Sequence, residues 1–281
     1  MLRLMIGAAM ISFSAVFVKL VSVGPMTSAF YRCLVGGVVL SVLIIAKGER
    51  LLRSGKAMLG LFIAAVFFAL DLGVWHQSIL YVGPGMSTLL GNSQVFILGF
   101  IGLVFLGDRF RWEIAISIPM GFAGLALMIL PDWSAQTDSY HVGIALGLLT
   151  AVFYSGYLLS LRRVRHKSVG ESASADLALV SLFSAALLVP AVLTTGESMA
   201  VPSLTDAGLL AAYGVVSQVV GWVLISSSLG RMPASRVGLV LLLQPLLTFV
   251  WDVLFFGRGL TILEVAGGLV ALTAIYLGAR R

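Results

Sequence analysis

Residues 57–81, AMLGLFIAAVFFALDLGVWHQSILY, decide the fold class of this chain because they carry a single formally charged side chain, Asp71. An apolar helix of about 20 residues crosses the hydrocarbon core of a bilayer, which is about 30 Å thick. The whole chain has this character, since its 281 residues are 59% hydrophobic and 11% charged. Soluble domains are about 25% charged. The composition therefore excludes a soluble enzyme and predicts a membrane protein.

Apolar stretches of this kind, bounded by Gly, Pro and charged residues, recur along the sequence. The strands of a transmembrane β-barrel alternate apolar and polar residues, and this alternation is missing here. Backbone groups at membrane depth must then form hydrogen bonds within their own segment, so we expect helices. The sequence predicts an all-α membrane protein with ten transmembrane helices, at residues 3–22, 25–46, 57–81, 84–106, 112–130, 142–162, 173–195, 205–229, 233–256 and 262–279.

The basic residues predict the orientation of these helices. If the N-terminus is cytoplasmic, most of the eighteen basic residues fall in cytoplasmic connections and tails, as the positive-inside rule requires. They are Arg3, Lys47, Arg50, Arg53, Lys56, Arg109, Arg111, Arg162, Arg163, Arg165, Lys167, Arg231, Arg236, Arg280 and Arg281. Both termini are therefore expected in the cytoplasm of an inner-membrane protein, and the net charge of +6 is a topology signal rather than a nucleic-acid site.

The N-terminus and the single cysteine predict neither a cleaved signal peptide nor a disulfide. Arg3 followed by an apolar run resembles a signal peptide, but no A-x-A-like cleavage site follows, so we expect an uncleaved first helix. Cys33 has no intrachain partner for a disulfide.

An internal duplication is expected at residues 1–131 and 140–281, joined by the connection Pro131–Tyr140. Each half has five predicted helices, and an odd number means that the second half enters the membrane from the opposite side. Weak matches support the repeat: Gln94 and Gln244 are 150 residues apart, and Pro84 and Pro233 both open the fourth helix of their halves. Inverted repeats of this type create a site near the midplane that opens alternately to either side.

The chain resembles the ten-helix drug/metabolite transporter superfamily with paired EamA-type domains. The likeness rests on FALDLGVWH at residues 68–76, Gly107-Asp108, the Pro-opened fourth and ninth helices, Gln244-Pro245, and glycine-rich fifth and tenth helices. The resemblance implies an exporter of metabolites, and one similar branch exports aromatic and other neutral amino acids. Val95 stands where the family often has a helix-breaking Pro, which argues against a kinked fourth helix. Arg258 stands where the second half often has an acid, which argues against coupling there.

Ionisable residues inside predicted spans are functional candidates by default, because they are costly in a bilayer. Asp71 and Arg32 lie at comparable depth, which predicts a structural charge pair. The alternative makes Asp71 a binding site for a proton or a substrate ammonium group. His76 is either a hydrogen-bonded packing residue or a cavity-lining one.

Neutral polar side chains gather at the middle of the fourth, eighth and ninth predicted helices. Amides in apolar spans need partners, either in another helix or in a wet cavity, and the clustering favours a cavity. Gln218 and Trp222 are spaced i, i+4 and share a helix face, while Tyr154 and Tyr157 would add aromatic walls. The candidate substrate-binding residues are Asp71, His76, Asn92, Gln94, Tyr154, Tyr157, Gln218, Trp222 and Gln244.

We therefore expect a transporter that exports small metabolites, best neutral or aromatic amino acids, by alternating access around a midplane cavity. The alternatives are proton-coupled efflux of other drugs or metabolites, a channel, and an intramembrane enzyme using Asp71 and His76 as acid and base. Catalytic, nucleotide and metal signatures are missing from the sequence, so no cofactor or metal is expected. The expected partners are a small-molecule substrate and the lipid bilayer, with no nucleic acid, and the expected state is a monomer or weak homodimer.

Overall fold

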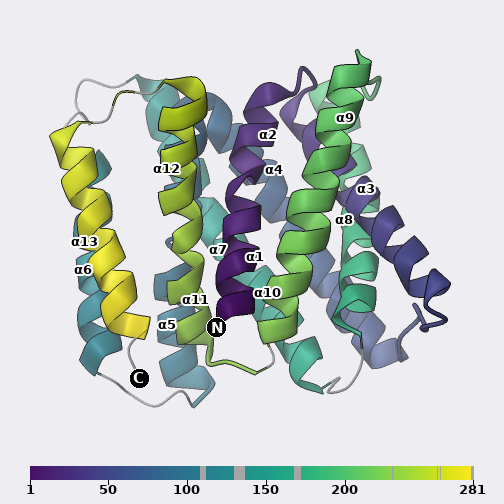
Figure 1. Ribbon diagram of the computed structural model, residues 1–281, viewed down its shortest axis with the longest axis horizontal. Helices are drawn as coiled ribbons and strands as arrows, with labels where there is room; N and C mark the ends of the chain where they lie inside the picture. The colour runs from purple at the N-terminus through teal and green to yellow at the C-terminus, as the bar shows by residue number, and fades with distance from the viewer. Residues whose placement is uncertain are drawn as a thin grey trace.

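The computed structural model describes residues 1–107, 112–129, 137–167, 172–229, 231–257, 259 and 261–279, and those residues form helices and short connections without strands. Several residues used in the sequence argument lie outside this set: Asp108, Arg109, Arg111, Arg258, Arg280, Arg281 and positions 131–136 of the central connection. In Figure 1, α1 begins and α13 ends at the same lower edge of the molecule.

The first half holds α1 (Leu2–Ser12), α2 (Ser14–Leu20), α3 (Pro25–Ala46), α4 (Gly55–Gly91), α5 (Gln94–Phe105) and α6 (Trp112–Ile129). The second half holds α7 (Asp138–Lys167), α8 (Ala173–Thr195), α9 (Leu204–Tyr213), the π-helix η2 (Gly214–Gly221), α10 (Trp222–Leu229), α11 (Ala234–Leu241), α12 (Leu243–Phe256) and α13 (Ile262–Ala279). Most predicted spans therefore coincide with single helices or with short runs of consecutive helices, whereas α4 covers the third span and the beginning of the fourth.

Seven helical segments among the described residues are long and apolar enough to cross a membrane. One of them, Gly55–Phe105, is 51 residues long and contains two predicted spans. A straight helix of that length would measure about 75 Å, more than twice the hydrocarbon core. The apolar parts of α6 and α13, Ala115–Gly124 and Ile262–Ala274, are shorter than the other segments. The count of ten crossings therefore stays a prediction.

A kink inside α4 explains how the long segment can change direction. Gly83 has φ 81°, a conformation that side chains rarely adopt, and Pro84 follows it without an amide proton. The next amide, that of Gly85, donates to Oδ2 of Asp252 on α12 at 3.2 Å. The kink thus separates the two predicted spans 57–81 and 84–106 at the position where the sequence places Pro84.

Three predicted spans are broken near their middle. α1 and α2 are separated at Phe13, α4 and α5 at Asn92 and Ser93, and α11 and α12 at Leu242. The third break has a covalent cause, because Pro245 has no amide proton for the Leu241 carbonyl. The expectation of an unkinked fourth helix, based on Val95, is wrong.

Hydrogen bonds explain the break in the fourth helix without a proline. The side chain of Asn92 donates to the Thr88 carbonyl at 2.8 Å and so competes with the backbone ladder. The amide of Val95 then donates to the Asn92 carbonyl at 3.1 Å, a tighter i to i+3 bond.

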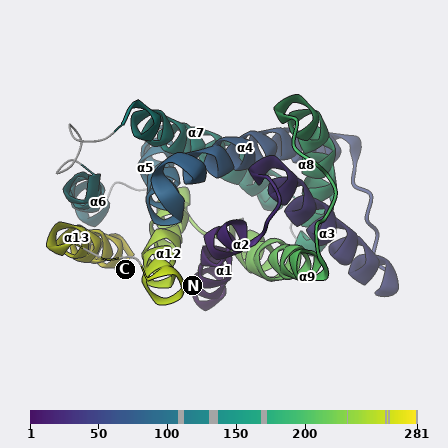
Figure 2. The same cartoon turned by 90° about the horizontal axis from the view of Figure 1, so that it is seen from above.

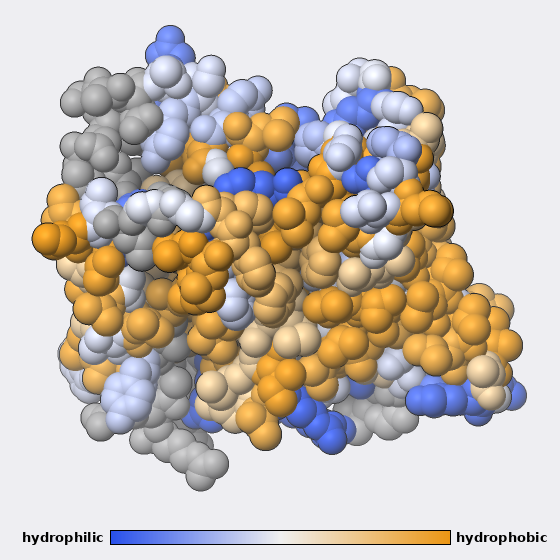
Figure 3. Space-filling model, turned by 45° about the horizontal axis from the view of Figure 1, so that its top comes forward, coloured by the Kyte–Doolittle hydropathy of each residue, from blue (hydrophilic) through white to orange (hydrophobic). Residues whose placement is uncertain are grey.

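Helix pairs from the two halves pack against each other throughout the molecule. α4 packs on α7, α3 on α8, α5 on α11, α6 on α13, and α1 on both η2 and α10. From above, α6 and α13 lie together at one end of the molecule and α3 reaches the other (Figure 2). Apolar side chains dominate the face in Figure 3, with hydrophilic residues gathered toward its edges, as expected for a surface in contact with lipid.

Candidate functional site

A cavity of about 50 Å³ lies where helices of the two halves meet. Its wall combines two charged side chains with hydroxyls, amides and aromatic rings, from α1, α2, α3, α4, α7, α10 and α12 and the break after α4. The lining residues are Ile11, Ser12, Ser14, Ala15, Arg32, Phe68, Asp71, Leu72, Trp75, Thr88, Gly91, Asn92, Thr150, Tyr154, Trp222, Gln244 and Thr248.

Arg32 is the cation of the cavity and is 3% exposed. Its Nε donates to Oε1 of Gln218 at 3.0 Å, and its Nη1 donates to the hydroxyl of Tyr213 at 3.0 Å. The guanidinium also lies over the ring of Tyr213, 5.0 Å from its centroid, and 5.5 Å from that of Phe68. These contacts fix the position of a buried cation that is paired with neutral groups.

Asp71 shares this cavity but makes no hydrogen bond or ion pair with another described residue. The Arg32–Asp71 charge pair stays a prediction: the two groups line one cavity and interact electrostatically, while the hydrogen bonds of the guanidinium go to Gln218 and Tyr213. A buried carboxylate beside a polar cavity is available to a ligand of opposite charge.

Trp222 forms the aromatic wall. Its ring meets Tyr157 edge to face at 4.7 Å, Phe68 at 5.6 Å and Tyr154 at 6.0 Å between centroids. Phe68 lines the cavity and stacks on Tyr157, which does not, with 4.5 Å between the ring centroids. The aromatic cluster gives the cavity a rigid apolar side.

Several polar atoms in the cavity wall have no partner among the described residues. They are the hydroxyl of Thr88, the Asn92 amide oxygen and the Trp222 indole nitrogen. Gln244, by contrast, donates to the Tyr154 hydroxyl at 3.2 Å. Buried polar groups are nearly always hydrogen-bonded, so unpartnered ones that face a cavity indicate that water or a polar ligand binds there.

The structure brings five of the predicted binding residues to the cavity: Asp71, Asn92, Tyr154, Trp222 and Gln244. The other four lie behind its wall. Tyr157 packs against Phe68 and Trp222, and the amide oxygen of Gln94 lies near Gly238 of α11. Both amide atoms of Gln94 are buried without a hydrogen-bond partner among the described residues.

Gln218 does not line the cavity, and its side chain is hydrogen-bonded to residues of α3 and α8 instead. Gly214–Gly221 is π-helical, and Trp222 begins the α-helix that follows it. Gly36 on α3 lacks a Cβ, and one added there would clash with Cγ of Gln218. Gln218 passes this glycine, binds Arg32 and donates to the Ser181 hydroxyl at 2.9 Å.

His76 is fully buried and packs rather than lining the cavity. Its Nδ1 hydrogen-bonds the Leu72 carbonyl at 2.7 Å, and its ring meets Trp75 edge to face at 5.0 Å. Because Asp71 lines the cavity and His76 does not, the two do not form the acid–base pair that the enzyme hypothesis requires. No cluster of metal-ligating side chains occurs among the residues that the structure describes.

The sequence argument missed the hydroxyls of the site. Ser12, Thr88, Thr150 and Thr248 all line the cavity. Thr248 donates to the Ser12 carbonyl at 3.2 Å and joins α12 to the break after α1. Ser and Thr are common in membrane helices, so only their position beside predicted midplane amides could have indicated them.

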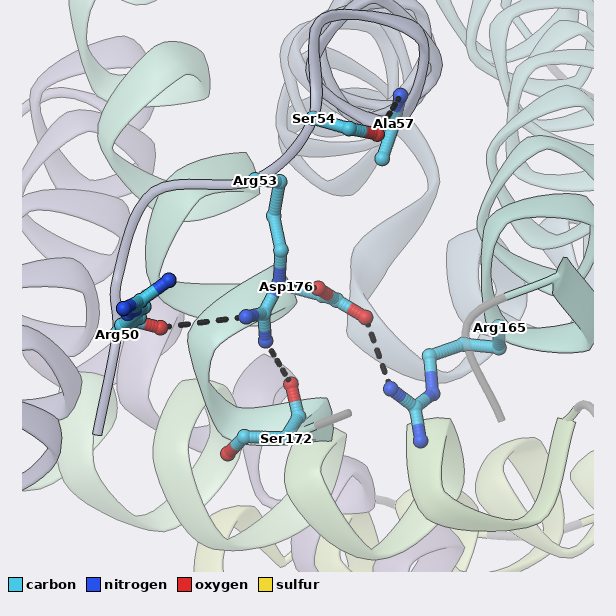
Figure 4. Close-up of polar contacts among 7 residues, drawn as sticks. All are labelled: Arg50, Arg53, Ser54, Ala57, Arg165, Ser172 and Asp176. Atoms are coloured by element: carbon cyan, nitrogen blue, oxygen red, sulfur yellow. Dashed lines mark hydrogen bonds and ion pairs between the residues drawn. The ribbon is translucent and has the colours of Figure 1, made fainter. Parts of the chain in front are cut away.

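Polar contacts hold the helices together on either side of the cavity. At one edge, Asp176 on α8 accepts from Nε of Arg53 at 2.8 Å and from Nη1 of Arg165 at 2.9 Å (Figure 4). Arg53 also donates to the Ser172 carbonyl at 2.8 Å. At the other edge, Glu197 accepts from the Thr27 amide at 2.9 Å at the start of α3.

Apolar helices from two halves around a central polar cavity are the architecture of a polytopic membrane transporter. The chain belongs to the EamA-like transporter family, whose model matches residues 1–130 and 141–279. It is thus a member of the drug/metabolite transporter superfamily, as the sequence motifs indicate.

One relative of this chain is an exporter. The chain is 27% identical to the pseudopaline exporter CntI of Pseudomonas aeruginosa over 87% of its length and 82% of the relative's. It is 24% identical to the uncharacterized transporter YvbV of Bacillus subtilis, over 90% and 82%. A solved crystal structure shares the fold with a TM-score of 0.77 at 17% identity, covering 98% of this chain and 95% of the other. These relatives give no support to the aromatic amino acid branch.

Proposed function

We propose that this transporter exports a small zwitterionic metabolite, with apolar and aromatic amino acids as the first candidates. One observation carries the proposal: the cavity between the two halves is lined by a basic group, Arg32, and an acidic group, Asp71, that make no direct hydrogen bond or ion pair with each other. A zwitterion offers the complementary charges to both. The similarity to an exporter of pseudopaline supports export of a metabolite.

Each group in the cavity has a role in this proposal. Asp71 accepts the substrate ammonium group and Arg32 donates to its carboxylate, because charge-assisted hydrogen bonds are about twice as strong as neutral ones. The unpartnered polar atoms of Asn92 and Thr88 complete the hydrogen bonds of these head groups. Trp222 and Trp75 form the apolar side that receives the side chain.

The volume of the cavity requires a conformational change during transport. Drug-sized ligands occupy pockets of about 300 Å³ or more, whereas this cavity measures about 50 Å³. A solute larger than a few water molecules therefore enters only when one edge opens. Opening at one edge separates Arg53 and Arg165 from Asp176, and opening at the other separates Glu197 from the start of α3.

The pattern of helix contacts is compatible with an exchange of the two predicted halves, and this supports the proposal of alternating access by an inverted repeat. A twofold exchange maps the first predicted span onto the sixth and the third onto the eighth. The α4–α7 contact then corresponds to the contact of α1 with η2 and α10, and the α3–α8, α5–α11 and α6–α13 contacts map onto themselves. The fourth and ninth spans are also broken at corresponding places, near Asn92 and at Leu242.

A second candidate is proton-coupled efflux, in which Asp71 binds a proton and a substrate in turn. It is favoured by the position of Asp71, the one carboxylate among the described residues that line the cavity. Coupled and facilitated export differ in one readout. Only coupled export is accelerated by an imposed proton gradient at constant substrate gradient, and loss of that acceleration in Asp71→Asn would assign the coupling to this residue.

Transport by purified protein in proteoliposomes tests the proposal. Radiolabelled leucine and phenylalanine are loaded inside, and efflux is measured with competing analogues that lack either the amine or the carboxylate. We expect saturable flux, and inhibition by each singly charged analogue to be at least tenfold weaker than by the zwitterion, because each leaves one buried charge unpaired. Absence of flux for every amino acid, or equal inhibition by all analogues, overturns the assignment.

A further inference from the structure

A groove of about 480 Å³ lies between the start of α4 and the end of α7, separate from the central cavity. Its charged lining residues are Lys56, Arg163 and Lys167, and its neutral polar residues include Ser54 and Ser160. We propose that this groove binds one anionic phospholipid of the adjoining leaflet, which the distribution of basic residues predicts to be the cytoplasmic one.

The three cations of the groove are free to bind an anion. None of Lys56, Arg163 and Lys167 makes an ion pair or side-chain hydrogen bond with another described residue, and all three are exposed. Nearby at the same edge, Arg53 and Arg165 are instead bound to Asp176 (Figure 4). At this edge, Arg53 and Arg165 are therefore paired with a carboxylate of the protein. The three basic residues of the groove are not. Basic pockets between membrane helices on the cytoplasmic side bind lipid head groups.

The polarity of the groove changes along α4 as it does along a phospholipid. Lys56 lies about 10 Å along the helix axis from Ile63, at a rise of about 1.5 Å per residue. Along this stretch, Leu59 is 61% exposed and Ile63 is 42% exposed. A head group at Lys56 thus places the acyl chains against Leu59 and Ile63.

The floor of the groove is formed by a close helix contact. Gly60 has no side chain, and a Cβ added there would lie 2.7 Å from Cγ2 of Val164 on α7. Because α4 and α7 approach closely at this glycine, the exposed side chains on either side of the contact form the walls of a continuous trough. Charge and shape together fit a lipid better than a free phosphate, which would leave the apolar wall uncovered.

Native mass spectrometry of the full chain titrated with phosphatidylglycerol or phosphatidylcholine in detergent tests the proposal. The charge variant is Lys56→Gln/Arg163→Gln/Lys167→Gln. The matched control is Lys47→Gln/Arg50→Gln/Arg231→Gln, which removes three exposed basic residues outside the groove and leaves the same net charge. A third variant, Ala57→Phe, fills the groove and retains all charges.

We expect one phosphatidylglycerol to bind the unaltered protein in preference to phosphatidylcholine. The charge variant should bind it about a hundredfold more weakly, at about 1 kcal/mol for each basic residue, and the control should bind within about threefold of the unaltered protein. Ala57→Phe should lose the bound lipid while keeping its charge. Inorganic phosphate should compete weakly, since it lacks chains.

Three outcomes overturn the proposal. Equal losses in the charge variant and the control indicate a diffuse surface attraction. Unchanged binding in Ala57→Phe places the lipid elsewhere, and equal competition by inorganic phosphate identifies an anion site without a lipid. Each variant is first checked for its elution volume and for the melting temperature of its tryptophan fluorescence, and Ser160→Leu replaces Ala57→Phe if the latter does not fold.

Discussion

Two buried aspartates, Asp71 and Asp176, have opposite surroundings. Asp176 is fully buried and pairs with Arg53 and Arg165, so both of its oxygens accept from a guanidinium. Asp71 is 7% exposed, lines the central cavity, and has no such partner among the described residues. A charge removed from water is stable only when a partner replaces the water, so we assign Asp176 a structural role and propose that Asp71 binds a ligand.

Asp252 represents an intermediate case. It accepts from the Gly85 amide at 3.2 Å, beyond the kink at Pro84, and its Oδ1 lies 3.8 Å from Lys19 Nζ. The Lys19 side chain is 42% exposed, so water screens that pair. The three aspartates therefore form a series that identical Asp→Asn replacements can rank, with transport and stability measured separately.

The largest effect is expected for transport in Asp71→Asn. Loss of the charge should lower the rate of zwitterion efflux by about a hundredfold, as when one partner of a buried ion pair is removed. The melting temperature should not fall, because the carboxylate has no described protein partner to lose. Proteoliposome efflux and tryptophan-monitored melting measure the two quantities. If Asp71→Asn unfolds the protein while retaining transport per folded molecule, Asp71 and Asp176 do not differ as proposed.

The next effect is on stability. Asp176→Asn leaves Arg53 and Arg165 without a carboxylate, and we expect the free energy of unfolding to fall by about 3 kcal/mol, as when a buried ion pair is broken. Denaturant titration in mild detergent measures it. Glu49→Gln serves as the control, because Glu49 is exposed in the connection between α3 and α4. It should change the free energy of unfolding by less than about 0.5 kcal/mol. Equal changes in the two variants would contradict a structural role for the cluster.

A smaller effect is expected for Gln218→Leu, which removes the acceptor for Arg32 Nε at similar volume. Arg32 should lose its fixed position, and transport should decrease about tenfold, or about 1.4 kcal/mol, within the cost of a hydrogen bond to a charged group. Because Gln218 does not touch the cavity, the loss should be larger for substrates with a carboxylate than for amine analogues. Equal losses for both substrate types would show that Gln218 acts only on folding.

The smallest effect is expected for Asp252→Asn, which weakens the cap on Gly85 and the pair with Lys19. Stability should fall by about 1 kcal/mol, as for a helix cap combined with a screened surface pair. Lys19→Met removes the ion pair and the contact of Lys19 Nζ with the Phe256 ring but leaves the Asp252–Gly85 hydrogen bond, and it should cost less. A loss from Asp252→Asn as large as that from Asp176→Asn would place Asp252 with the buried structural charges.

The sequence predicted the membrane class, the family and most helix positions, because apolar length and Pro or Gly boundaries are local properties. The kink at Pro84 and the break before Pro245 were indicated by residue type. The break at Asn92 was missed, since an asparagine in a helix breaks it only when its side chain captures a backbone carbonyl. The π-helix at Gly214–Gly221 was missed for a similar reason, as its wider turn leaves no unambiguous pattern in the sequence.

The site was predicted in part. Intramembrane polarity identified Asp71, Asn92 and Gln244, but it also selected Gln94 and His76, which are buried in packing. Composition shows that a polar side chain needs a partner. It does not show whether that partner is a neighbouring helix or a ligand.

By itself, the sequence determined that this chain is a polytopic helical membrane protein with charged and amide side chains at depth, since the cost of exposing polar backbone to lipid permits few other structures. Only the tertiary structure decided that Arg32 turns to Gln218 and Tyr213 and leaves Asp71 facing the cavity. Hydrogen bonds have a reach of about 3 Å. The choice among partners at similar depth is therefore made by helix packing and by glycines such as Gly36, which sequence periodicity does not encode.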